Sequence, residues 1–548
     1  MQATMMSIPM SVQMIMRYGA RHHAPSTVAS FDGAEYRRAT YADVAERAAR
    51  LGAALQALGV ERGDRVATYC WNHQQHLEAY LAVPSIGAVL HTLNTRLFSG
   101  QIAYIADHAD DRVLIADAAL LPQLRDVLPH TPSIKTLIVV GSCGDIEFAG
   151  ATHDYEDLIA RHAPLTDWPE LDENMAAAVC YTSGTTGNPK GVVYSHKTIF
   201  VHSLASMGVD TFAISQADRI LLLPPMFHAN AWGLPYSGWF AGSAFVMPGA
   251  HLQPDKVRAM IASEKPTFTA MVPTLLNDLL RSHQKNPLDM SSFRVIVSGG
   301  SPVSAALIER VRDTWNLPVI QGWGMTETSP LCALSVPPAG TPADEESLWR
   351  AKSGRPVPGV EVRILDDSGK NLPHDGKAVG ALQLRGPWIA RGYHRYQGED
   401  VLSPDGWLRT GDVGTIDSRG YVQITDRMKD IIKSGGEWIS SAELEGHLAR
   451  HPAVSEVAVI GVPDPRWEER PLAVIVTTHI HATGKDIDPA ALRAHLAGSV
   501  AKFWLPEYWA FVPEIPKTSV GKIDKRALRE MVAGGQIAYS REDAIAVP

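Results

Sequence analysis

The sequence predicts an α/β protein with a large N-terminal domain of doubly wound α/β subdomains, a small β-rich subdomain, and a small α+β C-terminal domain. Three observations lead to this fold class. The chain has 548 residues, which is too long for one hydrophobic core. Helical and strand patterns alternate through its first three quarters. Shorter strand patterns follow, and the last section again mixes helices and strands.

The first clear element is a helix from Thr40 to Gly59. Thr40 is a helix-capping residue, with Asp43 three positions later as in a capping box, and Gly59 can end the helix. Apolar residues recur at steps of three and four, which places them on one helical face. They are Val44, Ala48, Leu51, Leu55 and Leu58.

Short apolar runs in the large domain predict buried parallel strands. A strand is expected at Arg65–Tyr69, and three further runs end in glycine-rich turns: Ala176–Tyr181, Arg294–Ser298 and Leu317–Gln321. Ligands of open α/β sheets bind at the carboxyl ends of the strands, so we expect the functional loops there.

A connector rich in proline and charge, Leu334–Gly354, precedes the β-rich subdomain, which we place at about residues 350–426. We divide the chain into a large domain, residues 1–426, and a small C-terminal domain, residues 427–548. The elements expected after the connector are strands at Glu361–Leu365 and Ala381–Arg385, a helix at Ser441–Arg450, strands at Val457–Ile460 and Leu472–Thr478, and a helix from Pro489.

Composition excludes several classes of protein. The net charge of -9 argues against a nucleic-acid-binding surface, which needs excess lysine and arginine. The four cysteines are scattered and suggest neither a zinc site nor a disulfide framework, so a reduced, cytoplasmic setting fits best. We find no signal peptide and no apolar run of the length that a membrane span needs.

The most informative segment is residues 181–192, Tyr-Thr-Ser-Gly-Thr-Thr-Gly-Asn-Pro-Lys-Gly-Val, directly after an apolar strand. Glycines expose backbone N–H groups, hydroxyl residues add donors, and Lys190 adds a cation, so the segment can cradle a polyphosphate. The segment is not the P-loop of kinases and GTPases, because Pro189 stands where that motif needs its second glycine. A flexible polar linker is the alternative, but a linker would rarely follow a strand with this order of residues.

A second motif follows another predicted strand, at Gln321–Thr328. The indole of Trp323 lies between two glycines and can stack on a purine, and Glu327 can hold Mg²⁺, which prefers oxygen ligands. By itself this run would more often be a core tryptophan with a surface glutamate. The turn Gly299–Pro302 ends a further strand, and alone it is only a turn.

Taken in order, these motifs resemble AMP-forming acyl-CoA synthetases of the adenylate-forming enzyme superfamily, over nearly the whole chain. The resemblance implies Mg²⁺ on Thr182 and Glu327, and three catalytic residues, Lys522, Glu327 and His228. It implies that ATP and AMP are bound by Thr182, Ser183, Gly184, Thr185, Thr186, Gly187, Lys190, Gly300, Ser301, Pro302, Gln321, Gly322, Trp323, Gly324, Met325, Thr326, Asp412, Ile424, Arg427 and Lys433.

The same resemblance implies a mobile C-terminal domain. Lys429 matches the hinge about which this domain rotates, and Lys522, in Pro516–Lys525, matches the lysine that bridges the acid and the α-phosphate. After rotation, the pantetheine of coenzyme A would lie along Ser434, Gly435, Gly436, Glu437 and Trp438.

The acid pocket resembles that of the fatty-acyl branch, where a tryptophan gates the acyl tunnel. Its expected residues are His228, Asn230, Trp232, Gly300 and Gly324. For Trp232, gating and plain core packing stay equally open, and His228 alone would more often be structural. The expected substrate is a medium- or long-chain fatty acid. The alternative substrate is a short aliphatic acid such as 3-methylthiopropionate. The alternative enzyme class is an adenylating enzyme that does not use CoA.

The expected reaction uses ATP, Mg²⁺ and coenzyme A as the second substrate: the acid and ATP give acyl-AMP and pyrophosphate, and CoA then displaces AMP. A nucleotide sensor on the same fold is the competing class, but it would be expected to have lost Lys522 or Glu327, and both are present. A homodimer is expected only by analogy with long-chain relatives.

Overall fold

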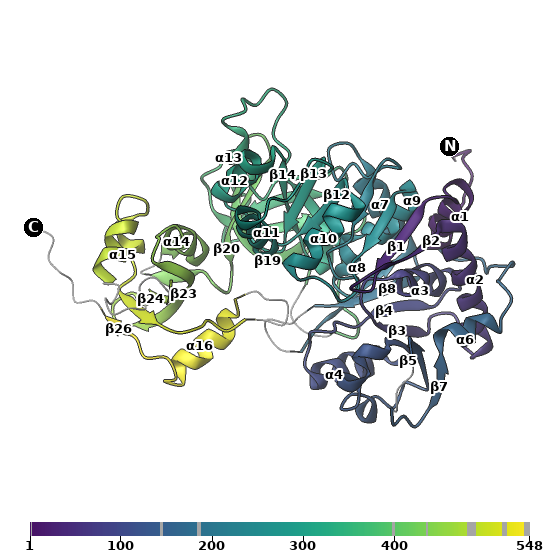
Figure 1. Cartoon of the computed structure of the whole chain (residues 1–548). Coiled ribbons are helices and arrows are strands. Elements are labelled where there is room, and N and C mark those ends of the chain that lie inside the picture. The colour runs from purple at the N-terminus through teal and green to yellow at the C-terminus, as the bar shows by residue number, and fades with distance from the viewer. Residues whose placement is uncertain are drawn as a thin grey trace, which may run out of the picture. The chain divides into compact units, whose positions relative to one another are not determined.

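The computed structural model describes residues 1, 3–142, 146–182, 188–396, 401–434, 437–478, 489–517 and 523–541 (Figure 1). The chain divides into two compact units. The first comprises residues 1–361 and 384–408, and the second comprises residues 362–383 and 409–548. The division into a large domain, residues 1–426, and a small C-terminal domain, residues 427–548, stays a prediction.

The first unit contains a seven-stranded sheet with the order β7-β6-β5-β3-β4-β8-β9. Neighbouring strands are parallel except for β8 and β9, which form an antiparallel pair. The strands are β3 (Arg65–Tyr69), β4 (Val89–Thr92), β5 (Asp111–Asp117), β6 (Thr136–Val140), β7 (Ala151–Asp154), β8 (Ala176–Tyr181) and β9 (Gly191–Ser195).

The second sheet of this unit has nine strands in the order β16-β15-β14-β13-β12-β10-β11-β1-β2. Its middle is parallel, and its two edges are antiparallel. The strands are β1 (Thr27–Phe31), β2 (Tyr36–Thr40), β10 (Arg219–Leu221), β11 (Ala244–Met247), β12 (Phe268–Met271), β13 (Val295–Gly299), β14 (Val319–Gly324), β15 (Leu331–Leu334) and β16 (Arg355–Pro356).

Helices accompany both sheets, and the connections between their parallel strands carry most of them. They are α1 (Val12–His22), α2 (Tyr41–Ala57), α3 (Gln74–Ser85), α4 (Ser99–Ala109), α5 (Leu121–Leu124), α6 (Tyr155–Ala160), α7 (His196–Met207), α8 (Ala229–Trp232), α9 (Leu234–Ala241), α10 (Pro254–Glu264), α11 (Pro273–Lys285), α12 (Ala305–Trp315) and α13 (Glu346–Arg350), with 3₁₀ turns η1 (Ala118–Leu120), η2 (Leu128–His130) and η3 (Thr326–Thr328).

The second unit holds most of a four-stranded sheet, ordered β17-β18-β19-β20, and a six-stranded sheet, ordered β22-β21-β24-β25-β26 with β23 paired to β24. The strands are β17 (Glu361–Leu365), β18 (Gly380–Arg385), β19 (Leu408–Ile416), β20 (Val422–Arg427), β21 (Ile432–Ser434), β22 (Glu437–Ile439), β23 (Val454–Asp464), β24 (Glu468–Thr477), β25 (Tyr508–Phe511) and β26 (Ser540–Arg541). The helical elements are α14 (Ser441–Leu448), α15 (Pro489–Leu496), η4 (Lys502–Trp504) and α16 (Lys525–Ala533).

The predicted fold class is confirmed, and local signals located many elements well. Helix α2 begins after Thr40, whose side chain accepts from the Asp43 backbone N–H, and the Asp43 carboxylate in turn accepts from the Thr40 backbone N–H. Strands β3, β8 and β17 lie where the apolar runs predicted them.

Several bounds differ from the sequence prediction: the strand expected at Val457–Ile460 is β23, from Val454 to Asp464, and the helix expected at Ser441–Arg450 ends at Leu448. The strand expected at Leu317–Gln321 runs from Val319 to Gly324, because its glycine-rich end pairs with β15 instead of forming a turn. The strand expected at Leu472–Thr478 begins at Glu468, because β23 and β24 form a long antiparallel pair that extends past the apolar run.

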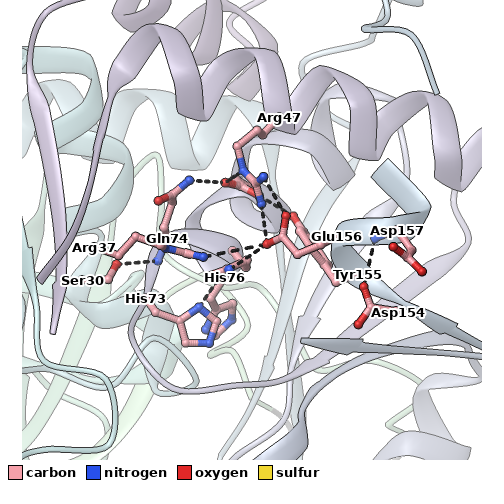
Figure 2. A network of polar contacts seen from close by, with 12 residues as sticks. Ser30, Arg37, Arg47, His73, Gln74, His76, Asp154, Tyr155, Glu156 and Asp157 are labelled. Carbon is pink, nitrogen blue, oxygen red and sulfur yellow. Dashed lines mark hydrogen bonds and ion pairs between the residues drawn. The ribbon is translucent and has the colours of Figure 1, made fainter. Parts of the chain in front are cut away.

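A polar network around the buried carboxylate of Glu78 joins three helices of the first unit (Figure 2). Arg47 of α2 donates to Glu78 of α3 at 2.7 Å and to both carboxylate oxygens of Glu156 in α6 at 2.8 Å. Glu78 is fully buried and also accepts from Gln74 and Tyr155. Burial raises the pKa of Glu78, and the guanidinium of Arg47 opposes that rise. The network therefore holds α2, α3 and α6 together through paired groups.

Three buried histidines predict that the first unit loses stability as the pH falls. Burial lowers the pKa of His76 to about 3 and those of His196 and His202 to about 4. Between pH 6.5 and these values the unfolded chain binds protons that the folded chain does not bind, so stability falls with falling pH. At pH 5 each of these histidines lowers the free energy of unfolding by about 2 kcal/mol.

The measurement is the urea midpoint of the first unfolding transition at pH 7 and pH 5. His202→Gln is expected to reduce the loss of stability between these two pH values by about 2 kcal/mol. The control is His22→Gln, because His22 is exposed. An equal loss in the wild type and in His202→Gln would contradict this explanation.

Candidate active site

The phosphate-loop segment is closed at its base. The backbone N–H of Thr182 donates to the carbonyl oxygen of Lys190 at 2.9 Å, and the Lys190 N–H donates to the Thr182 hydroxyl at 3.3 Å. These bonds continue the antiparallel pairing of β8 and β9, so the predicted loop is the connection of a β-hairpin. The prediction that it follows an apolar strand is confirmed.

Glu327 lies in η3, after the end of β14, and only 8% of its surface is exposed. The hydroxyl of Tyr194, in β9, donates to the carbonyl oxygen of Thr326 at 2.7 Å. The hydroxyl of Tyr393 donates to Glu327 Oε1 at 2.5 Å. The strand after the phosphate loop is therefore bonded directly to the turn that carries the expected magnesium ligand.

The end of β14 requires glycine for a steric reason. A β-carbon at Gly324 would lie 2.0 Å from the carbonyl oxygen of Pro330, at a point where the register of β14 and β15 shifts. Trp323 is buried there. Met325 donates its backbone N–H to the Thr328 hydroxyl at 2.9 Å. The backbone is thus held close to its neighbour, as a strand end that approaches a ligand often is.

Gln321 has a clear role in bracing this end of the sheet. Its side-chain oxygen accepts from the Val303 N–H at 2.5 Å, and its amide donates to the Lys352 carbonyl oxygen at 3.0 Å. The first bond connects β14 to the segment that follows the Gly299–Pro302 turn, and the second connects it to the residues after α13. Within that turn Gly300 has a φ of 82°, a conformation that glycine adopts without strain.

The expected acid-pocket residues lie on an unusual turn. Ala229, Asn230, Ala231, Trp232 and Gly233 all have φ between 43° and 76°. Left-handed conformations cost non-glycine residues about 1–2 kcal/mol each, so the surrounding contacts must hold this turn in place. Its conformation was not predicted from the sequence, because Asn230 and Gly233 are common left-handed residues but Ala229, Ala231 and Trp232 carry no such signal.

Contacts around the turn bring several expected residues together. A β-carbon at Gly299 would lie 3.2 Å from the Trp232 ring, so the indole lies against the turn that contains Gly300. The Asn230 side-chain oxygen accepts from the Cys180 thiol at 3.3 Å and from the Tyr80 hydroxyl at 3.4 Å. His228 precedes the turn and donates its backbone N–H to Pro225 at 3.0 Å.

In the second unit, two of the residues expected to bind ATP and AMP are direct cross-strand partners. Asp412 of β19 pairs with Arg427 of β20, and Asp412 Oδ1 lies 2.8 Å from Arg427 Nε. The Asp412 side chain is buried, whereas that of Arg427 is about half exposed. Ile424 lies in the same strand pair, opposite Gly414. This register explains how residues fifteen positions apart reach one site.

The expected hinge and CoA-binding residues also belong to the second unit. Burial lowers the pKa of the Lys429 ammonium. Lys433 and Ser434 lie in β21, directly opposite Trp438 and Glu437 of β22. The Ser434 hydroxyl accepts from Arg470 at 2.9 Å, so it is anchored in the unit's interior.

Some predicted residues lie outside the described part of the chain. They are Ser183, Gly184, Thr185, Thr186, Gly187, Gly435, Gly436 and Lys522. Of Glu437, only its place in β22 is described.

One further cluster has the composition of a metal site. Ligand atoms of Cys70, His73 and Asp117 lie within 4.8 Å of one another. His73 Nε2 lies 2.7 Å from Asp117 Oδ1, and the other carboxylate oxygen of Asp117 accepts from the Trp71 N–H at 2.8 Å. The histidine and the aspartate are therefore hydrogen-bonded to each other at the start of α3.

No helix in the part of the chain that the structure describes has the length and apolarity needed to cross a membrane.

The two α/β sheets, with the β8–β9 hairpin that carries the expected phosphate loop, have the architecture of an adenylate-forming enzyme. The comparisons with known proteins agree. The family model described as AMP-binding enzyme matches residues 17–394, and the model described as AMP-binding enzyme C-terminal domain matches residues 443–522. The chain therefore belongs to the AMP-binding enzyme family, as its motifs predicted.

Relatives match over nearly the full length. The chain is 40% identical to a 3-methylmercaptopropionyl-CoA ligase of Ruegeria pomeroyi, over 97% of this chain and 98% of the relative. It is 44% identical to a long-chain-fatty-acid–CoA ligase of Thermus thermophilus, over 90% of each chain. The crystal structure of the anthranilate CoA ligase AuaEII in complex with anthranoyl-AMP matches with a TM-score of 0.86 and 27% identity, over 98% of this chain and all of that one.

Proposed function

We propose that this chain is an AMP-forming acid–CoA ligase, which converts a carboxylic acid and ATP into acyl-AMP and pyrophosphate and then transfers the acyl group to coenzyme A. The observation that carries the proposal is the hydrogen-bonded junction of the phosphate-loop hairpin with the Glu327 turn. It brings a lysine-bearing loop and a buried carboxylate to one region of the first unit, as binding of a magnesium–nucleotide requires.

In the first step, two anions must meet. The Ser183–Lys190 loop would neutralise the β and γ phosphates, and Thr182 and Glu327 would hold Mg²⁺. Gly300, Trp323 and Thr326 would surround the adenosine and the α-phosphate, and Asp412 with Arg427 would bind the ribose. Lys522 would bridge the carboxylate and the α-phosphate, so that the acid oxygen attacks phosphorus in line with departing pyrophosphate.

In the second step, the thiol of CoA must reach the acyl carbon. Rotation of the C-terminal domain about Lys429 would withdraw Lys522 and bring the Ser434–Trp438 hairpin to the pantetheine. The thiol would lose its proton to solvent, its sulfur would attack the acyl carbon of the mixed anhydride, and AMP would leave with the bridging oxygen. His228 would lie beside the reacting carboxylate in the first step.

The acid is proposed to be a flexible aliphatic one. The relatives named above are ligases for a short sulfur-containing acid and for long-chain fatty acids, and they support both possibilities. Pyrophosphate release should be measured with saturated acids of two to sixteen carbons, 3-methylthiopropionate and benzoate. The greatest kcat/KM is expected for an aliphatic acid. A preference for benzoate would contradict the proposal.

Trp232→Ala is expected to change the chain-length preference and leave ATP binding largely unaltered. The indole lies against the Gly299 turn, so its removal opens space where the acid is expected to bind. The ratio of kcat/KM for dodecanoate and butyrate should change by about tenfold or more, since single methylenes are worth that much in apolar pockets.

The control for this variant is Trp467→Ala, because Trp467 is among the exposed hydrophobic residues of the second unit. Its acid profile should match that of the wild type. An unaltered profile in Trp232→Ala would show that this tryptophan only packs the core.

We also propose that the enzyme works in the cytoplasm and forms a homodimer, the latter by analogy with long-chain relatives. Sedimentation velocity tests the dimer.

A non-catalytic nucleotide sensor is the competing class of protein. Mass spectrometry after incubation with ATP, Mg²⁺ and octanoate separates the two, because a sensor retains nucleotide and forms no octanoyl-AMP.

A further inference from the structure

A segment that no motif assigned, Ala390–Tyr396, crosses the nucleotide region of the first unit. The Ala390 N–H donates to the carbonyl oxygen of Glu327 at 2.8 Å, and the His394 N–H donates to the carbonyl oxygen of Gly191 at 2.8 Å. The segment is thus bonded by its backbone both to η3 and to the first residue of β9. These two points flank the expected magnesium ligand and the end of the phosphate loop.

Two tyrosines of this segment hold the two charged side chains. The Tyr393 hydroxyl donates to Glu327 Oε1. The Tyr396 hydroxyl accepts from Lys190 Nζ at 2.9 Å, and the same ammonium lies 4.1 Å from the centre of the Tyr396 ring and 5.2 Å from that of Tyr393. The two rings meet edge to face, with their centres 5.6 Å apart.

The arrangement keeps opposite charges near one another without pairing them. Within the described ranges, no ion pair joins Lys190 to Glu327. Each is bonded instead to a neutral phenol. A direct ion pair between Lys190 and Glu327 would have to be broken before phosphate and Mg²⁺ could bind. A hydrogen bond to a phenol leaves most donors of the ammonium and most acceptor sites of the carboxylate available. An ammonium has three donors and a carboxylate about four acceptor sites, and each tyrosine hydroxyl occupies one.

We propose that Tyr393 and Tyr396 are positioning residues for magnesium–ATP: Tyr393 fixes the carboxylate of Glu327, and Tyr396 holds the ammonium of Lys190, before the nucleotide arrives. This inference rests on the proposed function, in which Glu327 binds Mg²⁺ and Lys190 binds phosphate. A lysine side chain that is already ordered loses less rotamer freedom on binding a phosphate, and an aromatic face stabilises its charge.

The test uses the full-length enzyme and the acid that the wild type turns over fastest in the acid panel. Tyr393→Phe removes only the hydroxyl. It is expected to raise the Mg²⁺ concentration for half-maximal pyrophosphate release about tenfold, since hydrogen bonds to charged groups are worth that much. The KM for the acid should stay within about twofold, because Glu327 is not among the residues expected to bind the acid.

Tyr396 is tested with two variants. Tyr396→Leu removes both the ring and the hydroxyl and should raise the KM for magnesium–ATP about fivefold, whereas Tyr396→Phe keeps the ring and should recover about half of that loss or more. Tyr36→Phe is the matched control, because the Tyr36 hydroxyl also makes one side-chain hydrogen bond, to Ser263, on the surface of the same unit. It should change neither constant.

Glu327→Gln separates failure of this inference from failure of the proposed function. If Glu327→Gln leaves the Mg²⁺ requirement unchanged, the proposed role of Glu327 is wrong and the role of Tyr393 falls with it. If Glu327→Gln raises the requirement but Tyr393→Phe does not, only the positioning role is wrong. The role is supported if Tyr393→Phe adds nothing further in the Glu327→Gln background. Equal increases in the KM values for ATP and acid would overturn it, since they indicate a merely structural effect.

Discussion

Lys522→Ala is expected to lower the rate of acyl-AMP formation about 10³-fold and to leave the transfer from supplied acyl-AMP to CoA within about threefold. The physical reason is that the carboxylate and the α-phosphate are both negatively charged and repel each other, and the lysine ammonium offsets this repulsion. Lys522 is proposed to bridge the acid and the α-phosphate only during the first step, and then to withdraw. The two half-reactions are measured separately, as pyrophosphate release from ATP and as AMP release from synthetic octanoyl-AMP with CoA.

Lys517→Ala is the matched control for Lys522→Ala. Lys517 lies five positions earlier and is paired with Glu456 at 2.7 Å, away from any role proposed in catalysis. Its removal should leave both half-reactions unchanged. Equal loss of both half-reactions in Lys522→Ala would contradict a role confined to the first step.

Glu327→Gln is expected to lower acyl-AMP formation by about 10²-fold or more at the lowest Mg²⁺ concentration that saturates the wild type. The amide has nearly the shape of the carboxylate but lacks its charge, so it is a poor ligand for a hard cation. The carboxylate is buried and bonded to Tyr393, which limits the chance that a neighbouring acid replaces it. Part of the lost rate should return at high Mg²⁺ concentration.

The control for Glu327→Gln is Glu361→Gln, because Glu361 is exposed and pairs with Arg385 on the surface. It should keep the Mg²⁺ dependence of the wild type. A Glu327→Gln variant with unaltered rate and unaltered Mg²⁺ dependence would remove Glu327 from the proposed metal site.

Local patterns predicted individual elements better than their assembly. The capping box at Thr40 and the apolar face after it located α2, because both signals lie within the helix itself. The sheet orders depend on distant pairings. Strand β1, near the N-terminus, pairs with β11, as in Val28 with Phe245, 217 positions later, and no local pattern records that partner. The same holds for Arg47, which meets Glu156 from a separate helix (Figure 2).

The site shows the same division between local and distant information. Motifs marked Lys190, Glu327, Asp412 and Arg427 separately, and the structure adds that Asp412 and Arg427 are cross-strand partners. Tyr393 was missed, since a tyrosine after glycine carries no chemistry by itself. Its importance depends on the Glu327 carboxylate, 66 positions earlier, which only the fold places within hydrogen-bonding distance.

The most direct test of the account follows oxygen from the acid. Octanoate labelled with ¹⁸O in both carboxyl oxygens is incubated with the enzyme, ATP, Mg²⁺ and CoA, and the products are weighed by mass spectrometry. If the carboxylate attacks the α-phosphorus and CoA then displaces AMP, each AMP carries one ¹⁸O atom and octanoyl-CoA keeps the other. Formation of ADP, or of AMP without the label, would contradict the proposal that this chain activates acids as acyl-adenylates.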